Sequence, residues 1–432
     1  MDPAITTLCV LAVAAFLFVT ELIPLAVTAM AACTALGILG VLPSKQVYAG
    51  LSNSTVVLFG GMFVIGAAMF KTGLAEAVGL WVVNKAGTKE VPLMGAIMVV
   101  TIALSAVSSN TGTVACLMPV IVGIANAAHI PASKELMPLA VAANVGGTIT
   151  MIGTPPNVIV TGALSAAGLP SFGFFEFALI GVPLSVIVLV YMLTIGRKTI
   201  PVKNAGAMDA AAVEAAKKEA GASDDNAPKS KTKMWISGLI LLGVVAAMAL
   251  NLKTVPLQTA AVTGAILCVI TGCLKEKEAY AGIDWVTIFL FAGMLSVATA
   301  MDKTGAGKLI ADTVVGMMGD HPNPIVLCAV LYLISNVLTQ FMSNTASAAL
   351  LAPIGISIAQ SIGADPKPVL MSIGIAASMA FATPMATPPN TLVLGPGGFN
   401  FNDYVKVGVP LCIITFIASV IIIPIFWPFF PG

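Results

Sequence analysis

Charged residues are scarce in this sequence. Its 432 residues include 20 Lys and Arg and 19 Asp and Glu, which is 9%, whereas soluble domains carry roughly 25%. So few charges could not cover the surface of a soluble protein of this size, and the low polarity also excludes intrinsic disorder. Nucleic-acid binding needs a basic surface, but the net charge is only +1. A polytopic helical membrane protein remains.

The sequence also lacks the residue patterns of metal, disulfide and enzyme sites. Its seven Cys are scattered in or beside apolar runs without a CxxC pair, and its two His, His129 and His321, lie far apart. Neither metal-ligand nor disulfide spacing is therefore present. Without a cluster of His, Cys and acids or a nucleophile elbow, we predict no enzymatic activity and no cofactor.

One polar segment holds a third of the charges. Residues 197–233 contain eight Lys and Arg and five acids, and we interpret them as a linker between an N-terminal part, 1–196, and a C-terminal part, 234–432. Positive residues favour the cytoplasmic side of a membrane protein, so we place the linker in the cytoplasm. Fifteen of the 20 positive residues then lie inside and five outside, and both termini lie outside.

The two parts repeat each other. FGGMFVIGAAMFKTG at 59–73 and FAGMLSVATAMDKTG at 291–305 agree at eight of fifteen positions, with an offset of 232. Two short motifs recur at nearly the same offset. They are SNT at 109–111 and 343–345, and TPPN at 154–157 and 387–390. The matches keep their order over about 150 residues, which indicates an internal duplication.

Long apolar runs predict about ten membrane spans and two helical hairpins. Two runs flank each SNT, and we expect them to form re-entrant hairpins at about 92–127 and 324–361. A longer run is interrupted by each TPPN, and we expect broken helices at about 136–168 and 367–398. The number of crossings in each part is odd, so a cytoplasmic linker makes the two repeats inverted.

The TPPN motifs predict a break near the middle of the membrane, because Pro-Pro removes two N–H donors and cannot continue a helix. Unwound carbonyls and helix C-termini can bind a cation there, and half-helix N-termini can face an anion. A single motif could be a proline kink that serves packing only. Paired interrupted spans at matching places in two repeats are typical of a transport site.

The SNT motifs supply hydroxyls and an amide, which can donate to carboxylate or sulfate oxygens and can coordinate Na⁺. Ser105 and Thr339 lie four residues before each motif, one helical turn away on the same face. Helix capping is the alternative role. Glu21 and Asp302 lie near span ends, so we do not predict a proton relay of buried acids. Since no Lys or Arg lies near the motifs, a bound anion needs dipoles, hydroxyls and co-bound cations.

The duplicated SNT and TPPN motifs, with TELIPLAVTAM at 20–30, resemble the divalent-anion/sodium symporter family, solute carrier family 13, over nearly the whole chain. The resemblance implies a homodimer of inverted-repeat protomers. Each would have a scaffold domain and a transport domain that contains the hairpins and broken helices and moves like an elevator. Members often have one more N-terminal span, and we expect that span to be missing because about three residues precede the first apolar run.

The resemblance also implies two sodium sites and one anion site. The first sodium site would use Ser105, Asn110 and the Gly153 carbonyl region, and the second Thr339, Asn344 and the Ala386 region. The dianion would lie between the two tips. Its contacts would be Ser109, Asn110, Thr111, Thr154, Ser343, Asn344, Thr345, Thr387 and Pro388.

The predicted function is secondary active transport of a small divalent anion, coupled to Na⁺, by a multi-pass protein of the plasma (inner) membrane. C4-dicarboxylates such as succinate, malate or fumarate are the first choice. A sulfate or tricarboxylate symporter and a Na⁺-independent dicarboxylate exchanger are the alternatives. An ion channel uses similar carbonyl chemistry, but paired broken helices favour alternating access. The predicted partners are the anion, Na⁺, the bilayer and a second copy of the chain, with no nucleic acid.

Overall fold

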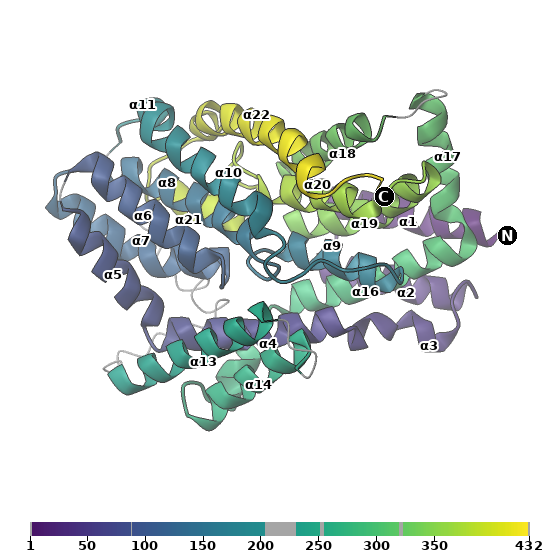
Figure 1. Ribbon diagram of the computed structural model, residues 1–432, viewed down its shortest axis with the longest axis horizontal. Helices are drawn as coiled ribbons and strands as arrows, with labels where there is room; N and C mark the ends of the chain where they lie inside the picture. The colour runs from purple at the N-terminus through teal and green to yellow at the C-terminus, as the bar shows by residue number, and fades with distance from the viewer. Residues whose placement is uncertain (1, 88, 204–229, 251–254, 319–322, 431–432) are drawn as a thin grey trace.

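The computed structural model describes residues 2–87, 89–203, 230–250, 255–318 and 323–430, and this part of the chain is helical without β-strands. Figure 1 shows the helices packed into one elongated body. Seven of the described helices are long and apolar enough to cross a membrane, and four shorter apolar helices accompany them. The predicted class, an all-helical polytopic membrane protein, is confirmed.

The helices of the first part recur in the second in the same order. The first part contains α1 (Pro3–Thr20), α2 (Leu25–Ile38), α3 (Ser44–Val47), α4 (Ser54–Lys71), α5 (Leu74–Ala86), α6 (Glu90–Ser105), α7 (Asn110–Ala127), α8 (Ala132–Gly146), α9 (Pro155–Ala166) and α10 (Ala178–Tyr191). Their counterparts are α13 (Lys231–Ala249), α14 (Leu257–Ile270), α15 (Glu276–Ala281), α16 (Trp285–Thr304), α17 (Ala306–Met318), α18 (Pro324–Thr339), α19 (Asn344–Ser361), α20 (Pro366–Ser378), α21 (Pro388–Leu394) and α22 (Phe401–Phe426). The structure thus contains the duplication inferred from the motifs.

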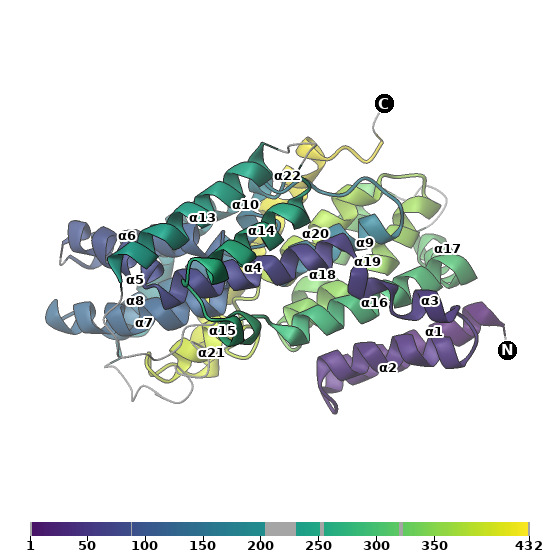
Figure 2. The same ribbon diagram turned by 90° about the horizontal axis from the view of Figure 1, so that it is seen from below.

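The two hairpins enter from opposite ends of the molecule. In Figure 1 the hairpin of α6 and α7 extends to the left-hand end, and that of α18 and α19 extends toward the right. Figure 2, seen from below, gives the same arrangement. Both tips, at Ser109 and Ser343, nevertheless line one cavity. This is the arrangement expected of inverted repeats.

The repeats interlock through two equivalent helix pairs. α2 packs against α16, and α14 packs against α4. A Cβ at Gly293 of α16 would lie 2.7 Å from the Ala29 carbonyl, and one at Gly61 of α4 would lie 2.8 Å from that of Ala261. Only glycine fits at these crossings, because the backbones themselves are in contact. In each pair a helix of one repeat packs against a helix of the other, so the two repeats share one packed core.

Polar contacts also join the two repeats in equivalent pairs. Lys71 at the end of α4 pairs with Glu278 in α15, and its counterpart Lys303 donates to Gln46 Oε1 of α3 at 2.6 Å. Partial burial disfavours the charge on Glu278, but hydrogen bonds from Lys71 and the Lys275 backbone hold the pKa of its carboxyl below the usual value. This ion pair therefore stabilises the fold at neutral pH and weakens as the pH falls.

Two helices, α5 and α17, have no counterpart among the predicted spans. They follow the repeated KTG, whose Gly73 and Gly305 have φ of 82° and 74°. Such left-handed residues end α4 and α16 and allow the chain to turn. The helices beyond carry charges, among them Glu76 and Lys308, so they form no long apolar run.

The other boundaries lie close to the predicted ones. The first broken helix spans α8 and α9 and begins four residues before the predicted 136, because Lys134 and Glu135 are buried rather than outside the span. The second spans α20 and α21 and ends at Leu394.

Of the predicted linker 197–233, residues 204–229 lie outside the described residues. A π-helical turn, η3 (Met192–Gly196), joins α10 to α11 (Arg197–Thr199).

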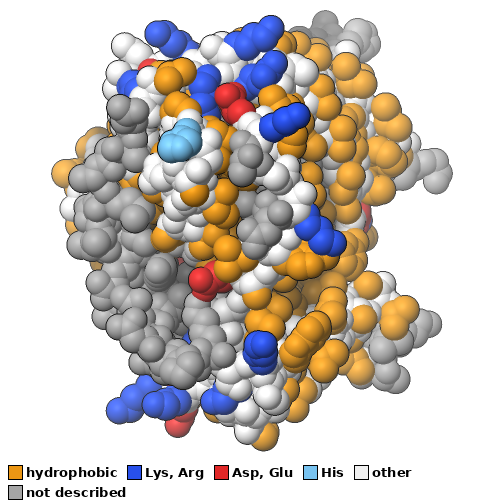
Figure 3. All heavy atoms as spheres, turned by 90° about the vertical axis from the view of Figure 1, so that its left-hand side faces the viewer, with side chains coloured by type: hydrophobic (Ala, Val, Ile, Leu, Met, Phe, Trp, Pro, Cys, Tyr) orange, Lys and Arg blue, Asp and Glu red, His pale blue; other side chains and the backbone are white. Residues whose placement is uncertain are grey.

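The surface has the polarity of a membrane protein. Figure 3 views the left-hand end of Figure 1, where Lys and Arg gather while apolar side chains cover the flank. Lys85 in the last turn of α5 and Lys89 just before α6 are both exposed. Along the flanks Phe16, Leu239 and Ile425 are 59%, 66% and 68% exposed. Apolar surface on this scale is expected to face lipid.

Candidate functional site

The two hairpin tips and the two helix breaks meet in one cavity of about 1020 Å³. Every residue predicted to contact the anion lines this cavity, as do four of the six predicted sodium-site residues, two of which, Asn110 and Asn344, belong to both sets. They are Ser109, Asn110, Thr111, Thr154, Ser343, Asn344, Thr345, Thr387 and Pro388, together with Gly153 and Ala386. Ser105 and Thr339 lie one layer deeper and are fully buried. The structure therefore brings together side chains that are more than 230 residues apart in the sequence.

The two breaks have almost the same backbone. Thr154 has φ −144° and ψ 142°, and Thr387 has φ −144° and ψ 149°. Pro155 and Pro388 then begin α9 and α21, since proline fits the first position of a helix. α7, α9 and α19 thus all begin at the cavity. All three direct positive dipole ends to it, and the first residues of α7 and α19 also present N–H groups, which Pro155 and Pro156 of α9 lack.

The tips also show the capping alternative. Ser109 Oγ accepts a hydrogen bond from the Gly112 N–H at 3.3 Å, so Ser109 caps α7. Ser343 precedes α19 without a side-chain cap. Capping therefore accounts for part of the first motif and for none of the second.

Oxygen atoms converge beneath the first tip. The inward-pointing amide atom of Asn110 lies 2.5 Å from Ser105 Oγ, 3.2 Å from the Ala143 carbonyl and 3.0 Å from the Gly153 carbonyl. Ser105 Oγ itself donates to the Ala143 carbonyl at 2.8 Å. An amide nitrogen at this position can donate to two of these acceptors, whereas an amide oxygen there can accept only from Ser105 Oγ and faces two carbonyl oxygens, an arrangement that a cation among them would stabilise.

The second tip repeats this arrangement. Asn344 Oδ1 lies 2.5 Å from Thr339 Oγ1, and Thr339 Oγ1 lies 2.8 Å from the Ala377 carbonyl. One hydroxyl proton cannot serve both acceptors. The two clusters are equivalent under the internal repeat, which favours the same function for both.

The last residue of each TPPN motif closes the break behind the cavity. Asn157 Nδ2 donates to the Thr150 carbonyl at 2.9 Å, and Asn390 Nδ2 donates to the Thr383 carbonyl at the same distance. These carbonyls belong to unwound backbone, which must be satisfied inside the protein when it lies in a membrane. The sequence contained both Asn residues, but their role follows only from the geometry.

Asn157→Leu and Asn390→Leu should each destabilise the protein by about 1–3 kcal/mol, the cost of leaving a buried polar group unsatisfied. The measurement is thermal unfolding in detergent. Asn126→Leu is the matched control, because Asn126 is exposed on α7. Unfolding temperatures equal to that of the control would show that the hydrogen bonds of Asn157 and Asn390 do not stabilise the two breaks.

Comparison with known proteins identifies the family. A profile of the citrate transporter family, CitMHS, matches residues 15–366. The chain belongs to this family. A transporter of Haemophilus influenzae is 30% identical over 97% of this chain and 91% of its own length. The sodium-dependent dicarboxylate transporter SdcS of Staphylococcus saprophyticus is 26% identical over 94% of this chain and 83% of its own length.

The fold of this citrate transporter family member recurs in a solved structure. The YdaH transporter of Alcanivorax borkumensis superposes with a TM-score of 0.67 at 13% identity, covering 98% of both chains. At that identity the likeness concerns the fold alone. The family and the relatives confirm the resemblance drawn from SNT and TPPN, and they place the protein among membrane transporters.

One cavity residue of this transporter was missed by the sequence reasoning. Asn144 on α8 reaches the second break, where its Nδ2 donates to Thr387 Oγ1 and to Asn390 Oδ1, each at 3.1 Å. Ser378 on α20 approaches Thr154 Oγ1 at 3.5 Å from the other side. Each break is thus tied to the other repeat. No repeated motif marks Asn144, because the residue at the equivalent place, one after the paired Ala143 and Ala377, is Ser378.

A buried acid was missed as well. Glu135 in the first turn of α8 has no exposed surface, and no described residue forms a hydrogen bond with either of its carboxyl oxygens. The acids considered in the sequence lie elsewhere. Glu21 is exposed and lines the mouth of the cavity, while Asp302 is exposed in the last turn of α16.

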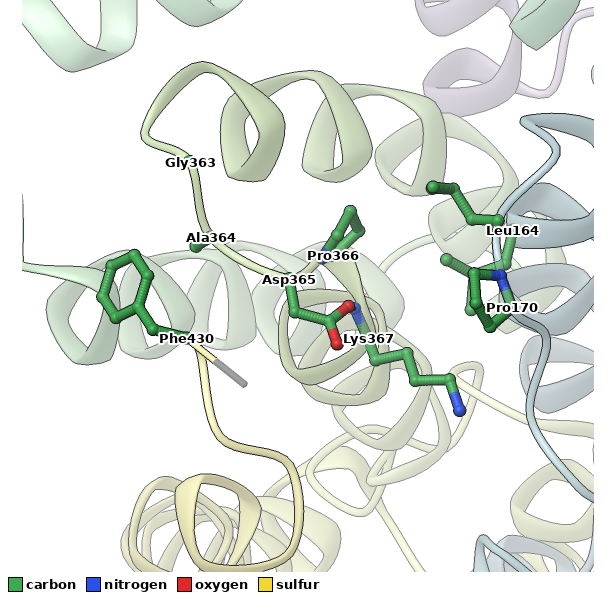
Figure 4. Close-up of a pocket in the computed structure, with 9 residues that line it drawn as sticks. Leu164, Pro170, Gly363, Ala364, Asp365, Pro366, Lys367 and Phe430 are labelled. Carbon is green, nitrogen blue, oxygen red and sulfur yellow. The ribbon is translucent and has the colours of Figure 1, made fainter. Parts of the chain in front are cut away.

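A second cavity of about 600 Å³ lies where α20 begins, beside the C-terminal segment. Figure 4 shows Asp365, Lys367 and Phe430 among its lining. Lys367 Nζ donates to Glu176 Oε1 at 3.2 Å, so its charge is already paired. None of the predicted site residues lines this cavity.

Proposed function

We propose that this transporter carries small divalent anions, with C4-dicarboxylates as the first choice, and that Na⁺ drives the transport. The lining of the central cavity carries the proposal. Among its described residues there are hydroxyls, amides and the acids Glu21 and Asp284, but no Lys, Arg or His. Helix N-termini attract an anion, but two negative charges beside an acidic mouth need further compensation. Co-bound cations would supply it.

The two oxygen clusters support Na⁺ as that cation. Na⁺ in transporters is commonly held by unwound carbonyls and helix ends. Asn110 and Asn344 each belong to a cluster and also line the cavity. A bound Na⁺ would draw their amide oxygens inward and leave the amide N–H groups to face the anion. Cation and anion would thereby strengthen each other.

The walls of the cavity support alternating access by an elevator movement. One wall is apolar and belongs to the interlocked helices, with Phe59, Met62 and Phe63 of α4. The opposite wall consists of the polar tips and breaks. A substrate held only by the polar wall could move with it along the apolar one. We propose that the interlocked helices form the scaffold of a homodimer.

Succinate is the preferred probe, since SdcS is named a dicarboxylate transporter, and the family description makes citrate the second candidate. Uptake of labelled succinate into proteoliposomes should rise several-fold with an inward Na⁺ gradient and should stay at background with K⁺. Unlabelled citrate and sulfate in excess would rank the alternatives. Na⁺-indifferent uptake accelerated by internal succinate would indicate an exchanger, and single-channel currents would contradict the transporter mechanism.

A further inference from the structure

We propose that Glu135 is a proton-binding site, and that its proton controls how tightly α6 and α8 close around the first oxygen cluster. The second half of this statement rests on the proposed Na⁺ and anion sites, whereas the first does not. A carboxyl group so placed responds to pH although it lies outside the cavity. The ligand of Glu135 is the proton. The transporter would bind its anion and Na⁺ more tightly when Glu135 is protonated.

The geometry links Glu135 to the site through one helix pair. α6 and α8 pack against each other. At the cavity end, Ser105 Oγ of α6 donates to the Ala143 carbonyl of α8. Nearby, a Cβ at Gly146 would lie 2.7 Å from the Ile102 Cα, so the backbones are in contact. Glu135 lies eight residues before Ala143, roughly 12 Å along α8 at 1.5 Å per residue.

The surroundings of Glu135 favour its neutral form. The residue is fully buried, and among the described residues neither of its carboxyl oxygens has a hydrogen-bond partner and no ion pair includes it. An ionised carboxylate in such a place loses its hydration without compensation. Glu90, in the first turn of α6, acts on Glu135 electrostatically and opposes a second negative charge. Binding a proton removes both penalties.

The cation adjacent to Glu135 in the sequence is engaged elsewhere. Lys134, the adjacent residue, donates to the backbone carbonyls of Arg197 and Ile200 at 2.5 and 2.9 Å and so points toward α11. The elements packed against α8 are α6, α7, α10, α21 and the short helix η2 (Gly147–Ile149). Their titratable residues, with those adjoining α6 and in α11, are Lys89, Glu90, Cys116, Tyr191, Arg197 and Lys198. Glu90 is the only acid in this set.

Loss of the proton would act on the cargo site. An ionised Glu135 would repel Glu90 and draw in water, and both effects push the start of α6 away from α8. The Ser105–Ala143 contact at the other end would then loosen, and the affinity for Na⁺ and anion would fall as the pH rises. Because linkage is reciprocal, binding of the cargo should take up protons in the pH range where Glu135 is partly ionised.

The test uses the purified full chain with succinate and Na⁺ between pH 7 and 9.5, where the succinate carboxyls stay ionised. Calorimetry should show an affinity that falls with pH by up to about tenfold per unit, the limit for one linked proton. Glu135→Gln, a neutral isostere, should keep the high affinity across the range. Glu135→Met is the second neutral variant if the first folds poorly, and Glu276→Gln, at an exposed site, should behave like the unaltered protein.

Two readouts separate proton binding from a merely structural role. In weak buffer, an indicator dye should report proton uptake on adding succinate and Na⁺, and both neutral variants should abolish it. Infrared spectra should contain a protonated-carboxyl C=O band that Glu135→Gln removes. A band unchanged in that variant, or a wild-type pH profile in it, overturns the proposal. If the protein binds none of succinate, citrate or sulfate, the proposed function fails, and the infrared band still decides the state of Glu135.

Discussion

Asn110→Ala and Asn344→Ala should each abolish succinate uptake. Both side chains belong to an oxygen cluster and also line the cavity, so one truncation removes contacts to cation and anion together. Hydrogen bonds to charged groups contribute about 1.5–3 kcal/mol each. The loss of two such contacts corresponds to roughly a hundredfold or greater loss of affinity. The measurement is Na⁺-driven uptake into proteoliposomes.

Asn126→Ala is the matched control for this experiment. Asn126 lies on α7 like Asn110, but it is exposed and lies outside the cavity lining. Its uptake should equal that of the unaltered protein, and all variants should elute from size-exclusion chromatography at the same volume. Normal uptake by both cavity variants would remove the basis for the site assignment.

Gly147→Ala and Gly153→Ala should have an equally large effect on the first cluster alone. A Cβ at Gly147 would lie 2.6 Å from Asn110 Oδ1 and 2.8 Å from the Gly153 carbonyl. A Cβ at Gly153 would lie 2.4 Å from the Gly147 carbonyl. These neighbours are mainly backbone, which cannot rotate away as a flexible side chain can. Each methyl group would fill or distort the cluster, and we expect uptake to fall to background at every Na⁺ concentration.

The second repeat provides an internal comparison. The counterparts of Gly147 and Gly153 are Ala380 and Ala386, so the second break accommodates the methyl groups that the first cannot. Gly123→Ala on α7 is the control substitution, since a Cβ there meets no atom within 4 Å. Na⁺-dependent uptake that survives in Gly147→Ala would show that the first cluster is not a sodium site.

Much of the architecture could be predicted because its determinants are local. Apolar runs of membrane length, Pro-Pro inside them, and SNT between paired runs each constrain the backbone around them. The duplication then indicated that equivalent motifs belong together. The predicted hairpins at 92–127 and 324–361 therefore lie close to the observed α6–α7 and α18–α19. α5 and α17 escaped prediction because their charged residues interrupt the apolar pattern.

The sequence alone determined the fold class, the repeat and the motifs that reach the cavity, because each depends on the order of residues along a single helix or turn. Only the tertiary structure decided which polar side chains are buried and against what. Asn144 meets Thr387 and Asn390 because a helix of one repeat packs on the break of the other. Glu135 is buried in a helix, α8, that packs against α6, α7 and α10. Burial depends on helices distant in sequence, so no local pattern could reveal it.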